Sequence, residues 1–256
     1  DMQVRYRGSV LGWAWSYVKP AAQFLVYFIA MGVFLGLNRS LPNYPVYLFS
    51  GLVVMNYFNE AFMNATRSVI DNTALVKKIY LPRELFPVSS VIIAFVNFFP
   101  QLVVLMAASL MVGYHPSFAQ VGFILLSILI ITVLALGLGL IFGAINVGLR
   151  DAQNIVELIM MFSTWLSPVL YNAALVDRVA PHWVVVLYNL NPLTGAVGLM
   201  HLGAWAPTTA QDAATMSLIG PHILIYGLIA IGTSLIVLLL GELVFRRMEK
   251  NFAQDL

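Results

Sequence analysis

The sequence predicts an all-α integral membrane protein of six transmembrane helices, with an N-terminal interfacial helix and short re-entrant helices between spans five and six. Three observations lead to this prediction. The 256 residues are 61% hydrophobic and only 9% charged, whereas a soluble domain carries about 25% charged residues. Apolar stretches recur along the chain, and about 20 such residues cross a bilayer core. The charges gather between these stretches, so residues 1–256 are expected to form a single transmembrane domain.

Composition and motifs exclude several classes of protein. The absence of cysteine excludes disulfides, thiol catalysis and cysteine-bound metals. No basic patch suits nucleic acid, no Gly-x-x-x-x-Gly-Lys-[Ser/Thr] motif is present to bind ATP, and no Ser/His/Asp grouping suggests a nucleophile. We also expect no cleavable signal peptide, because no short apolar segment precedes a small-residue cleavage site. The four histidines are expected at interfaces or in outer loops, without metal-ligand spacing: His115, His182, His201 and His222. We therefore predict no catalytic residue, no metal and no cofactor in this chain.

The first half of the chain is expected to hold four spans. Residues 1–19 interleave Arg and Lys with Trp and Tyr, which is typical of a helix lying in the membrane interface; an ordinary flank of the first span is the alternative. Residues 20–67 are expected to hold spans one (20–37) and two (46–67), and residues 85–145 spans three (85–112) and four (121–145). Gly139 and Gly143 in the fourth span have the small-xxx-small spacing of closely packed membrane helices.

The second span carries a polar stripe. Asn56, Glu60, Asn64 and Arg67 are spaced by four, four and three residues, which puts them within one quadrant of a helix. A charge at mid-bilayer costs about 2.5–3.5 kcal/mol on insertion scales, so the stripe is expected to face protein or water. Two interpretations remain open, a structural ion pair between Glu60 and Arg67 and the lining of a transport pathway.

Residues 70–84 form the most charge-dense interior segment. The side-chain oxygens of Asp71, Asn72 and Thr73 are candidates for an N-cap, and Pro82 cannot continue a helix, so a helix of about two turns is expected between them. Leu75, Val76 and Ile79 are expected on one side, and Lys77 and Lys78 on the other. Such a helix is too short and charged to cross a bilayer, and its apolar face needs a partner. We hypothesise that this partner is a separate soluble protein that supplies energy.

The second half contains shorter apolar pieces. A fifth span is expected over residues 155–172, although its apolar stretch, 155–170, is short for a full crossing. Residues 181–190 and 192–204 are expected as outer re-entrant gate helices over residues 181–204, with Asn191 as an N-cap and Pro192 at the first helical position. A sixth span is expected at 223–244, and a charged tail at 245–256.

The basic residues give an orientation. With six crossings, eleven of the thirteen Lys and Arg residues fall on one side, and only Arg39 and Arg178 fall opposite. Cytoplasmic loops are enriched in Lys and Arg, so we expect both termini and both charged interior loops to face the cytoplasm.

Taken together, the motifs resemble a known family over essentially the whole chain: the six-helix permease subunits of ABC exporters for polysaccharides such as O-antigen, teichoic acid and mycobacterial galactan. Five segments carry the resemblance: Arg5-Tyr-Arg-Gly-Ser-Val-Leu-Gly-Trp-Ala-Trp15 before Lys19-Pro20, Asn72-Thr-Ala-Leu-Val-Lys-Lys-Ile-Tyr-Leu-Pro-Arg-Glu-Leu-Phe-Pro87, Asn146-Val-Gly-Leu-Arg-Asp151, Ser167-Pro-Val-Leu-Tyr171 and Asn189-Leu-Asn-Pro-Leu193.

The resemblance implies partners and roles. It implies a homodimer in the bacterial cytoplasmic (inner) membrane, two separate nucleotide-binding ATPase subunits that bind ATP and Mg, and a lipid-linked polysaccharide as substrate. Residues 72–81 would be the coupling helix, the short pieces after Tyr171 would be gate helices, and the channel would lie between two copies, lined by spans one, two and five. The coupling residues are Asn72, Thr73, Leu75, Val76, Lys77, Lys78, Ile79, Tyr80, Arg83, Glu84, Arg150 and Asp151; the channel-lining candidates are Tyr27, Asn56, Glu60, Asn64, Arg67, Phe162, Trp165 and Tyr171; and the gate residues are Pro168, Asn191 and Pro192.

Two alternatives remain. A drug or antibiotic ABC exporter permease would share the architecture, but an apolar cargo prefers a hydrophobic cavity, and the polar stripe favours a polar cargo. An intramembrane enzyme acting on lipid-linked sugars would need two carboxylates within reach, for which Glu60 and Glu157 are remote candidates.

Overall fold

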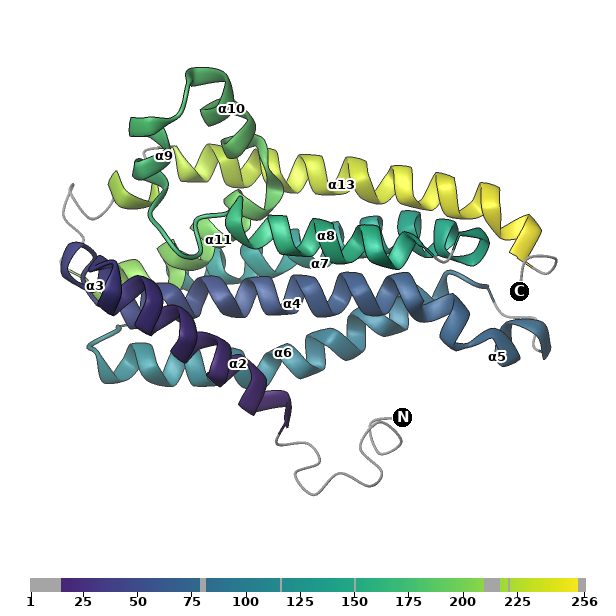
Figure 1. The fold of residues 1–256 in the computed structure, drawn as a ribbon, viewed down its shortest axis with the longest axis horizontal. Helices are drawn as coiled ribbons and strands as arrows, with labels where there is room; N and C mark the ends of the chain where they lie inside the picture. The colour runs from purple at the N-terminus through teal and green to yellow at the C-terminus, as the bar shows by residue number, and fades with distance from the viewer. Residues whose placement is uncertain are drawn as a thin grey trace.

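The computed structural model describes residues 15–78, 82–115, 117–149, 151–209, 217–220 and 222–252. These residues form helices joined by turns, and no β-strand occurs among them, as the sequence predicts. The long helices lie side by side in one bundle (Figure 1), and α4 (Tyr44–Asp71) packs against both α6 (Leu85–Met111) and α7 (Phe118–Gly148). The main hydrophobic core surrounds α4, most of whose residues are buried.

Helix α4 is longer than the predicted second span. It runs for 28 residues and extends beyond 46–67 at both ends. Pro45 lies in its first turn, where a missing N–H costs nothing. At the other end Ser68 and Val69 are buried against the bundle, so the helix continues past Arg67. The polar stripe therefore lies within a helix that continues beyond the predicted span at both ends.

The first helix differs from its prediction. Helix α2 (Trp15–Tyr27) continues as a π-helix, η2 (Phe28–Phe34), and Pro20 lies inside α2. The predicted interfacial helix over residues 1–19 falls mostly outside the described residues, but residues 15–19 belong to the same helix as the first span. The described helix has no break at Lys19-Pro20, since Pro20 lies inside α2, and an interfacial helix over residues 1–19 stays a prediction.

Close helix contacts are made through glycine. A Cβ at Gly139 would collide with Ala65 of α4, and a Cβ at Gly143 would lie 3.2 Å from the Ala65 carbonyl oxygen. The small-xxx-small prediction for the fourth span is thereby confirmed. Gly137 allows an equally close contact between α7 and α13 (Ile223–Met248), since a Cβ at Gly137 would lie 2.7 Å from the Leu238 backbone.

After α7 the chain forms short helices. Helix α8 (Ala152–Trp165) has 14 residues and ends well before the predicted end of the fifth span. Three short helices follow, α9 (Ala173–Val179), α10 (His182–Leu190) and α11 (Pro192–Met200), and α11 continues into η3 (His201–Trp205) and η4 (Ala206–Thr208). Helix α10 is bent by 72° from the helical stretch that begins at Pro192. This bend at the Asn191-Pro192 break agrees with a broken or re-entrant element.

By length and apolarity, three helices of the described chain can cross a membrane: Leu85–Met111, Phe118–Gly148 and Ser217–Met248. The bent pair around Pro192 would make a fourth. The apolar stretch of α2 and η2, Val18–Phe34, is shorter than these three helices. Helix α8 is shorter still. Helix α4 is long enough to cross, but it carries the polar stripe. Six crossings therefore stay a prediction, while the length and apolarity of the described helices fit a membrane protein with several spans.

Candidate functional site: a polar helix with a coupling end

The polar stripe of α4 is tied to two neighbouring helices. Asn56 donates from Nδ2 to Gln101 Oε1 of α6 at 3.5 Å, and Glu60 accepts from Asn97 Nδ2 of α6 at 2.6 Å. Further along α4, Arg67 donates from Nε to Gln153 Oε1 of α8 at 2.9 Å. The face of α4 that bears the stripe therefore lies between α6 and α8.

These contacts bear on the two interpretations of the stripe. Glu60 is held by a side chain of α6 and Arg67 by a side chain of α8. Their hydrogen bonds thus place the two charges against different neighbours. Asn56, Glu60, Asn64 and Arg67 are all partly exposed. The four side chains thus keep part of their surface accessible, and both interpretations of the stripe stay predictions.

Helix α8, whose Gln153 binds Arg67, exposes large apolar side chains, two of them aromatic. Phe162 is 55% exposed and Trp165 49% exposed, and Leu158 lies one turn before Phe162 with 54% exposure. Tyr27, the remaining aromatic candidate of the first span, is partly buried against the main core. The rings of Phe162 and Trp165 are therefore accessible to molecules outside this chain, whereas Tyr27 packs against the chain's own core.

A network of buried rings, which we call the aromatic end, locks one end of α4. Tyr47 stacks on His201 with ring centroids 3.9 Å apart and meets Trp205 edge-on at 4.9 Å. His201 Nε2 lies 3.1 Å from the Tyr47 carbonyl oxygen, and Trp205 Nε1 donates to Pro42 O at 2.8 Å. Tyr44 completes the network, with its hydroxyl donating to Leu170 O at 3.2 Å.

The prediction for His201 was wrong. Its side chain is 1% exposed, whereas His115, His182 and His222 are exposed as expected. A single histidine in an apolar run carries no local signal of burial. The spacing of Tyr44 and Tyr47, and of His201 and Trp205, places each pair on one helical face, and this is the signal that could have revealed the network.

The predicted gate residues lie next to the aromatic end. Pro168 is buried, and its carbonyl oxygen is 3.0 Å from the Tyr47 hydroxyl, which also lies 2.8 Å from Tyr171 O. Asn191 caps α11 by accepting from Leu193 N at 3.1 Å, and Pro192 occupies its first turn. The local structure predicted for Asn191-Pro192 is confirmed, while its role as a gate stays a prediction.

The predicted coupling helix is α5 (Thr73–Lys78), a helix of six residues. Ile79 and Tyr80 lie outside the described residues, as does Arg150, and so does the side chain of Lys78. Lys77 is exposed, and Asp151 is exposed just before α8. A short, charged helix at the end of α4 is thus present where it was predicted.

Two details of α5 differ from the prediction. Asn72 Nδ2 donates to Ser68 O at 2.8 Å, and Thr73 Oγ1 donates to Ile70 O at 2.6 Å, so these side chains cap the end of α4 instead of beginning α5. Leu75 and Val76 do not share a buried face, because adjacent helical positions point about 100° apart. Leu75 is 45% exposed, whereas Val76 packs on a small hydrophobic cluster.

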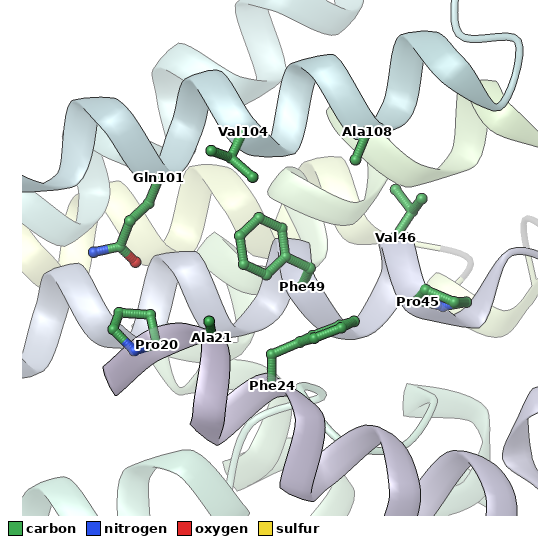
Figure 2. Close-up of a pocket in the computed structure, with 9 residues that line it drawn as sticks. All are labelled: Pro20, Ala21, Phe24, Pro45, Val46, Phe49, Gln101, Val104 and Ala108. Atoms are coloured by element: carbon green, nitrogen blue, oxygen red, sulfur yellow. The ribbon is translucent and has the colours of Figure 1, made fainter. Parts of the chain in front are cut away.

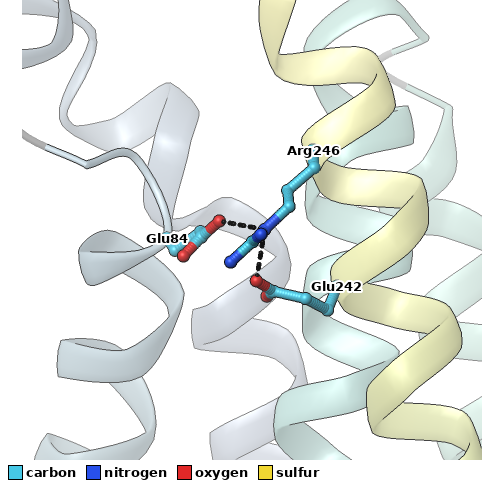
Figure 3. Close-up of polar contacts among 3 residues, drawn as sticks. All are labelled: Glu84, Glu242 and Arg246. Atoms are coloured by element: carbon cyan, nitrogen blue, oxygen red, sulfur yellow. Dashed lines mark hydrogen bonds and ion pairs between the residues drawn. The ribbon is translucent and has the colours of Figure 1, made fainter.

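Beyond α5, the chain is bound to the end of α13. Glu84 Oε1 lies 3.1 Å from Arg246 Nε, which also pairs with Glu242 Oε1 at 2.6 Å (Figure 3). Arg83 donates to the backbone oxygen of Glu249, and its guanidinium lies 5.7 Å from the Phe252 ring centroid. Arg83 and Glu84, both predicted coupling residues, therefore face the chain's own C-terminal region. We call α5, Arg83, Glu84 and the end of α13 the coupling end.

An apolar cavity of about 340 Å³ lies between α2, the start of α4 and α6 (Figure 2). Among its lining residues are Pro20 and Phe24 of α2, Phe49 of α4 and Val104 of α6, and its polar lining residue Gln101 is the partner of Asn56. Gln101 thus stands between the cavity and the polar stripe. Among the described residues, no three His, Asp or Glu side chains come together as metal ligands.

The fold and site define a polytopic α-helical membrane protein that carries a polar stripe within its bundle and a short exposed helix at one end. The chain belongs to the ABC-2 type transporter family, whose model matches residues 1–203. It is similar to the O-antigen export system permease protein RfbA of Klebsiella pneumoniae, at 28% identity over 197 residues, 77% of this chain and 74% of that protein. It is also similar to the protein of the same name from Myxococcus xanthus, at 30% identity over 171 residues, 67% and 65% of the two chains. The family expected from the sequence motifs is confirmed.

Proposed function

We propose that the chain is the channel-forming permease subunit of an ABC exporter that moves a lipid-linked polysaccharide across the bacterial cytoplasmic membrane, powered by a separate ATPase subunit. Family membership makes it a membrane subunit of a transporter, and relatives are named as O-antigen export permeases. The observation that carries the proposal is α4, a single helix with a polar stripe from Asn56 to Arg67 and the exposed helix α5 directly at its end.

The chemistry of the stripe supports a polar cargo. Asn56 and Asn64 offer amide donors and acceptors, and Glu60 and Arg67 offer charge-assisted hydrogen bonds. Glycan hydroxyls can exchange hydrogen bonds with such groups as they pass. The exposed rings of Phe162 and Trp165 on α8, a helix that contacts α4, add flat apolar surfaces. A glycan can use both kinds of surface: its hydroxyls bind polar groups, and the less polar faces of its sugar rings pack on aromatic rings.

The apolar cavity supports the second candidate, an exporter of apolar drugs or antibiotics. Its lining is hydrophobic apart from Gln101, as an apolar cargo prefers. Transport of a lipid-linked glycan and of a hydrophobic dye by the same reconstituted complex separates the two candidates. The enzyme alternative has weaker support, since Glu60 is engaged by Asn97 and Glu157 is exposed on α8.

The energy would enter through α5. Val76 packs inward on the bundle and Leu75 points outward beside the exposed Lys77. An exposed leucine next to a lysine suits a partner with an apolar notch and an acidic rim. In the proposed assembly two copies of the chain, with their termini in the cytoplasm, enclose the channel between spans one, two and five. Each copy rests on one ATPase subunit, which holds ATP and Mg, while membrane lipids surround the dimer.

Reconstitution tests the proposal. The chain is purified with the P-loop ATPase that co-purifies with it, placed in proteoliposomes and assayed for ATP hydrolysis and glycan export. We expect the double variant Leu75→Ala with Lys77→Glu to insert normally and to lose ATP-driven export. Leu243→Ala is the matched control, because Leu243 is 65% exposed on the membrane-spanning part of α13. Full export by the double variant, or glycan turnover by the chain without any ATPase, would overturn the proposal.

A further inference from the structure

The C-terminal turn of the chain contacts the segment that follows the coupling helix. This turn, η5 (Glu249–Asn251), together with Phe252 and Arg246, meets Arg83 and Glu84 at the start of α6. These contacts join positions more than 160 residues apart in the chain. We name Arg83, Glu84, Arg246 and Phe252 the C-terminal clasp.

The clasp has a buried part and an exposed part. Phe252 is 1% exposed and Phe245 is not exposed at all, and their rings meet edge-to-face at 5.4 Å. Arg83 covers the Phe252 ring as a cation–π partner. The ion pair is exposed instead, with 63% of the Arg246 side chain in contact with solvent. Exposed pairs contribute little and are screened by salt, so the buried ring is the main anchor and the ion pair sets its position.

The anchor and the coupling helix share one hydrophobic cluster. Phe252 and Phe245 belong to a small hydrophobic cluster with Val69 of α4, and Val76 of α5 packs against this cluster. The other members come from α7. One cluster therefore receives α5 and the C-terminal turn, and Arg83 and Glu84 bind that turn and α13 just beyond α5. Figure 1 shows α5 and the C-terminal end of α13 at the same end of the bundle.

We propose that the clasp is part of the coupling apparatus: Phe252 and Arg83 position the coupling helix and carry its displacement directly into α13. A displacement of α5 then acts on α4 through the chain connection and on α13 through the clasp. Without the clasp, the ATPase would still bind Leu75 and Lys77 and would still hydrolyse ATP, but less of the motion would reach the bundle. This inference rests on the proposed function, since it assigns a role within the coupling to an ATPase.

The test measures ATP hydrolysed per glycan exported in proteoliposomes that hold the complete complex. We expect Phe252→Ala to raise this ratio about fivefold, the low end of a typical coupling between sites, with the same amount of ATPase bound. Phe252→Tyr keeps the ring and is expected to keep the ratio. Lys250→Ala is the matched control, because Lys250 is exposed within the same turn.

A covalent clasp gives an independent readout. The chain has no cysteine, so Glu84→Cys with Arg246→Cys can be joined by a short bis-maleimide without other reaction sites. In the Phe252→Ala background this link is expected to restore the wild-type ratio. An unchanged ratio in Phe252→Ala, or a fall in bound ATPase that accounts for all the lost export, would overturn the clasp. A wild-type complex without ATP-driven export would instead overturn the proposed function.

Discussion

The aromatic end and the coupling end of the bundle are held by different forces. At the aromatic end, Tyr47, His201 and Trp205 are buried, and they make neutral hydrogen bonds to backbone groups of other segments. At the coupling end, the contacts between segments include the exposed Glu84–Arg246 ion pair, the contacts of Arg83 with Glu249 O and the Phe252 ring, and one small hydrophobic cluster. Buried, satisfied networks rigidify a structure, whereas exposed pairs are weak and screened by salt.

This difference indicates which parts can move. In η3, His201 is bound to Tyr47 of α4, and the Trp205 ring meets the Tyr47 ring edge-on. We therefore expect η3 and the adjoining α11 to move with α4 as one body. Helices α9 and α10 project from the bundle in Figure 1 and are mostly exposed. Motion at the predicted gate is therefore expected in α9 and α10. At the other end of the bundle, the elements of the coupling end are expected to move together.

The largest effect is expected from Trp205→Ala at the aromatic end. It leaves a cavity and removes the hydrogen bond to Pro42 O, which we expect to lower the free energy of unfolding by about 3 kcal/mol. Thermal unfolding followed by circular dichroism in detergent measures it. Trp183→Ala is the control, since Trp183 is 66% exposed. Equal losses from the two variants would show that the aromatic end is no anchor.

The second effect is expected from Gly51→Ala in the same region. A Cβ at Gly51 would lie 3.1 Å from Val169 Cα and 3.3 Å from His201 Nε2. Because backbone and a stacked ring cannot easily give way, we expect a loss of about 2 kcal/mol in the same unfolding assay. Gly232→Ala, with open space around the new Cβ, should be neutral or slightly stabilising. A neutral Gly51→Ala would mean that α4 and the Val169 turn are loosely packed.

A smaller effect is expected from Tyr47→Phe. The change removes the hydroxyl near Pro168 O and Tyr171 O and keeps the ring on His201. Polar contacts between membrane helices are modest, so a loss of about 1 kcal/mol is expected. Hydrogen exchange of the backbone around Tyr171 should rise at the same time. Unchanged exchange there would indicate that the hydroxyl does not hold the gate segment.

The smallest effect on stability is expected from Arg246→Ala at the coupling end. Its pairs with Glu84 and Glu242 are exposed, so the melting temperature should change little, and less at high salt than at low salt. Melting curves at the two salt concentrations measure this. A large, salt-independent loss would show that the coupling end is as firmly anchored as the aromatic end.

Sequence patterns predicted the elements better than their environments. The length of the apolar stretches predicted the long helices, Asn191-Pro192 predicted the start of α11, and the spacing of Gly139 and Gly143 predicted a close helix contact, which is made with α4. These signals are local, because caps and small residues act within a few positions of the chain. The short helix α5 was found in the same way, from a proline and a run of charges.

What failed depends on tertiary contacts. The burial of His201 is decided by Tyr47, 154 positions away. The different environments of Leu75 and Val76 are decided by the cluster under Val76, to which α7 and α13 contribute. Asn72 and Thr73 could cap either neighbouring helix, and the structure assigns them to α4. The local pattern of residues along the sequence therefore does not predict these environments.

The most direct measurement places a photo-crosslinking amino acid at Leu75 or at Val76 in cells that carry the exporter. The two positions are adjacent, but Leu75 faces outward and Val76 packs on the chain's own cluster. We predict that position 75 crosslinks to a P-loop ATPase, while position 76 crosslinks within the chain. Crosslinks from position 75 only to lipid or to the chain itself would contradict the account.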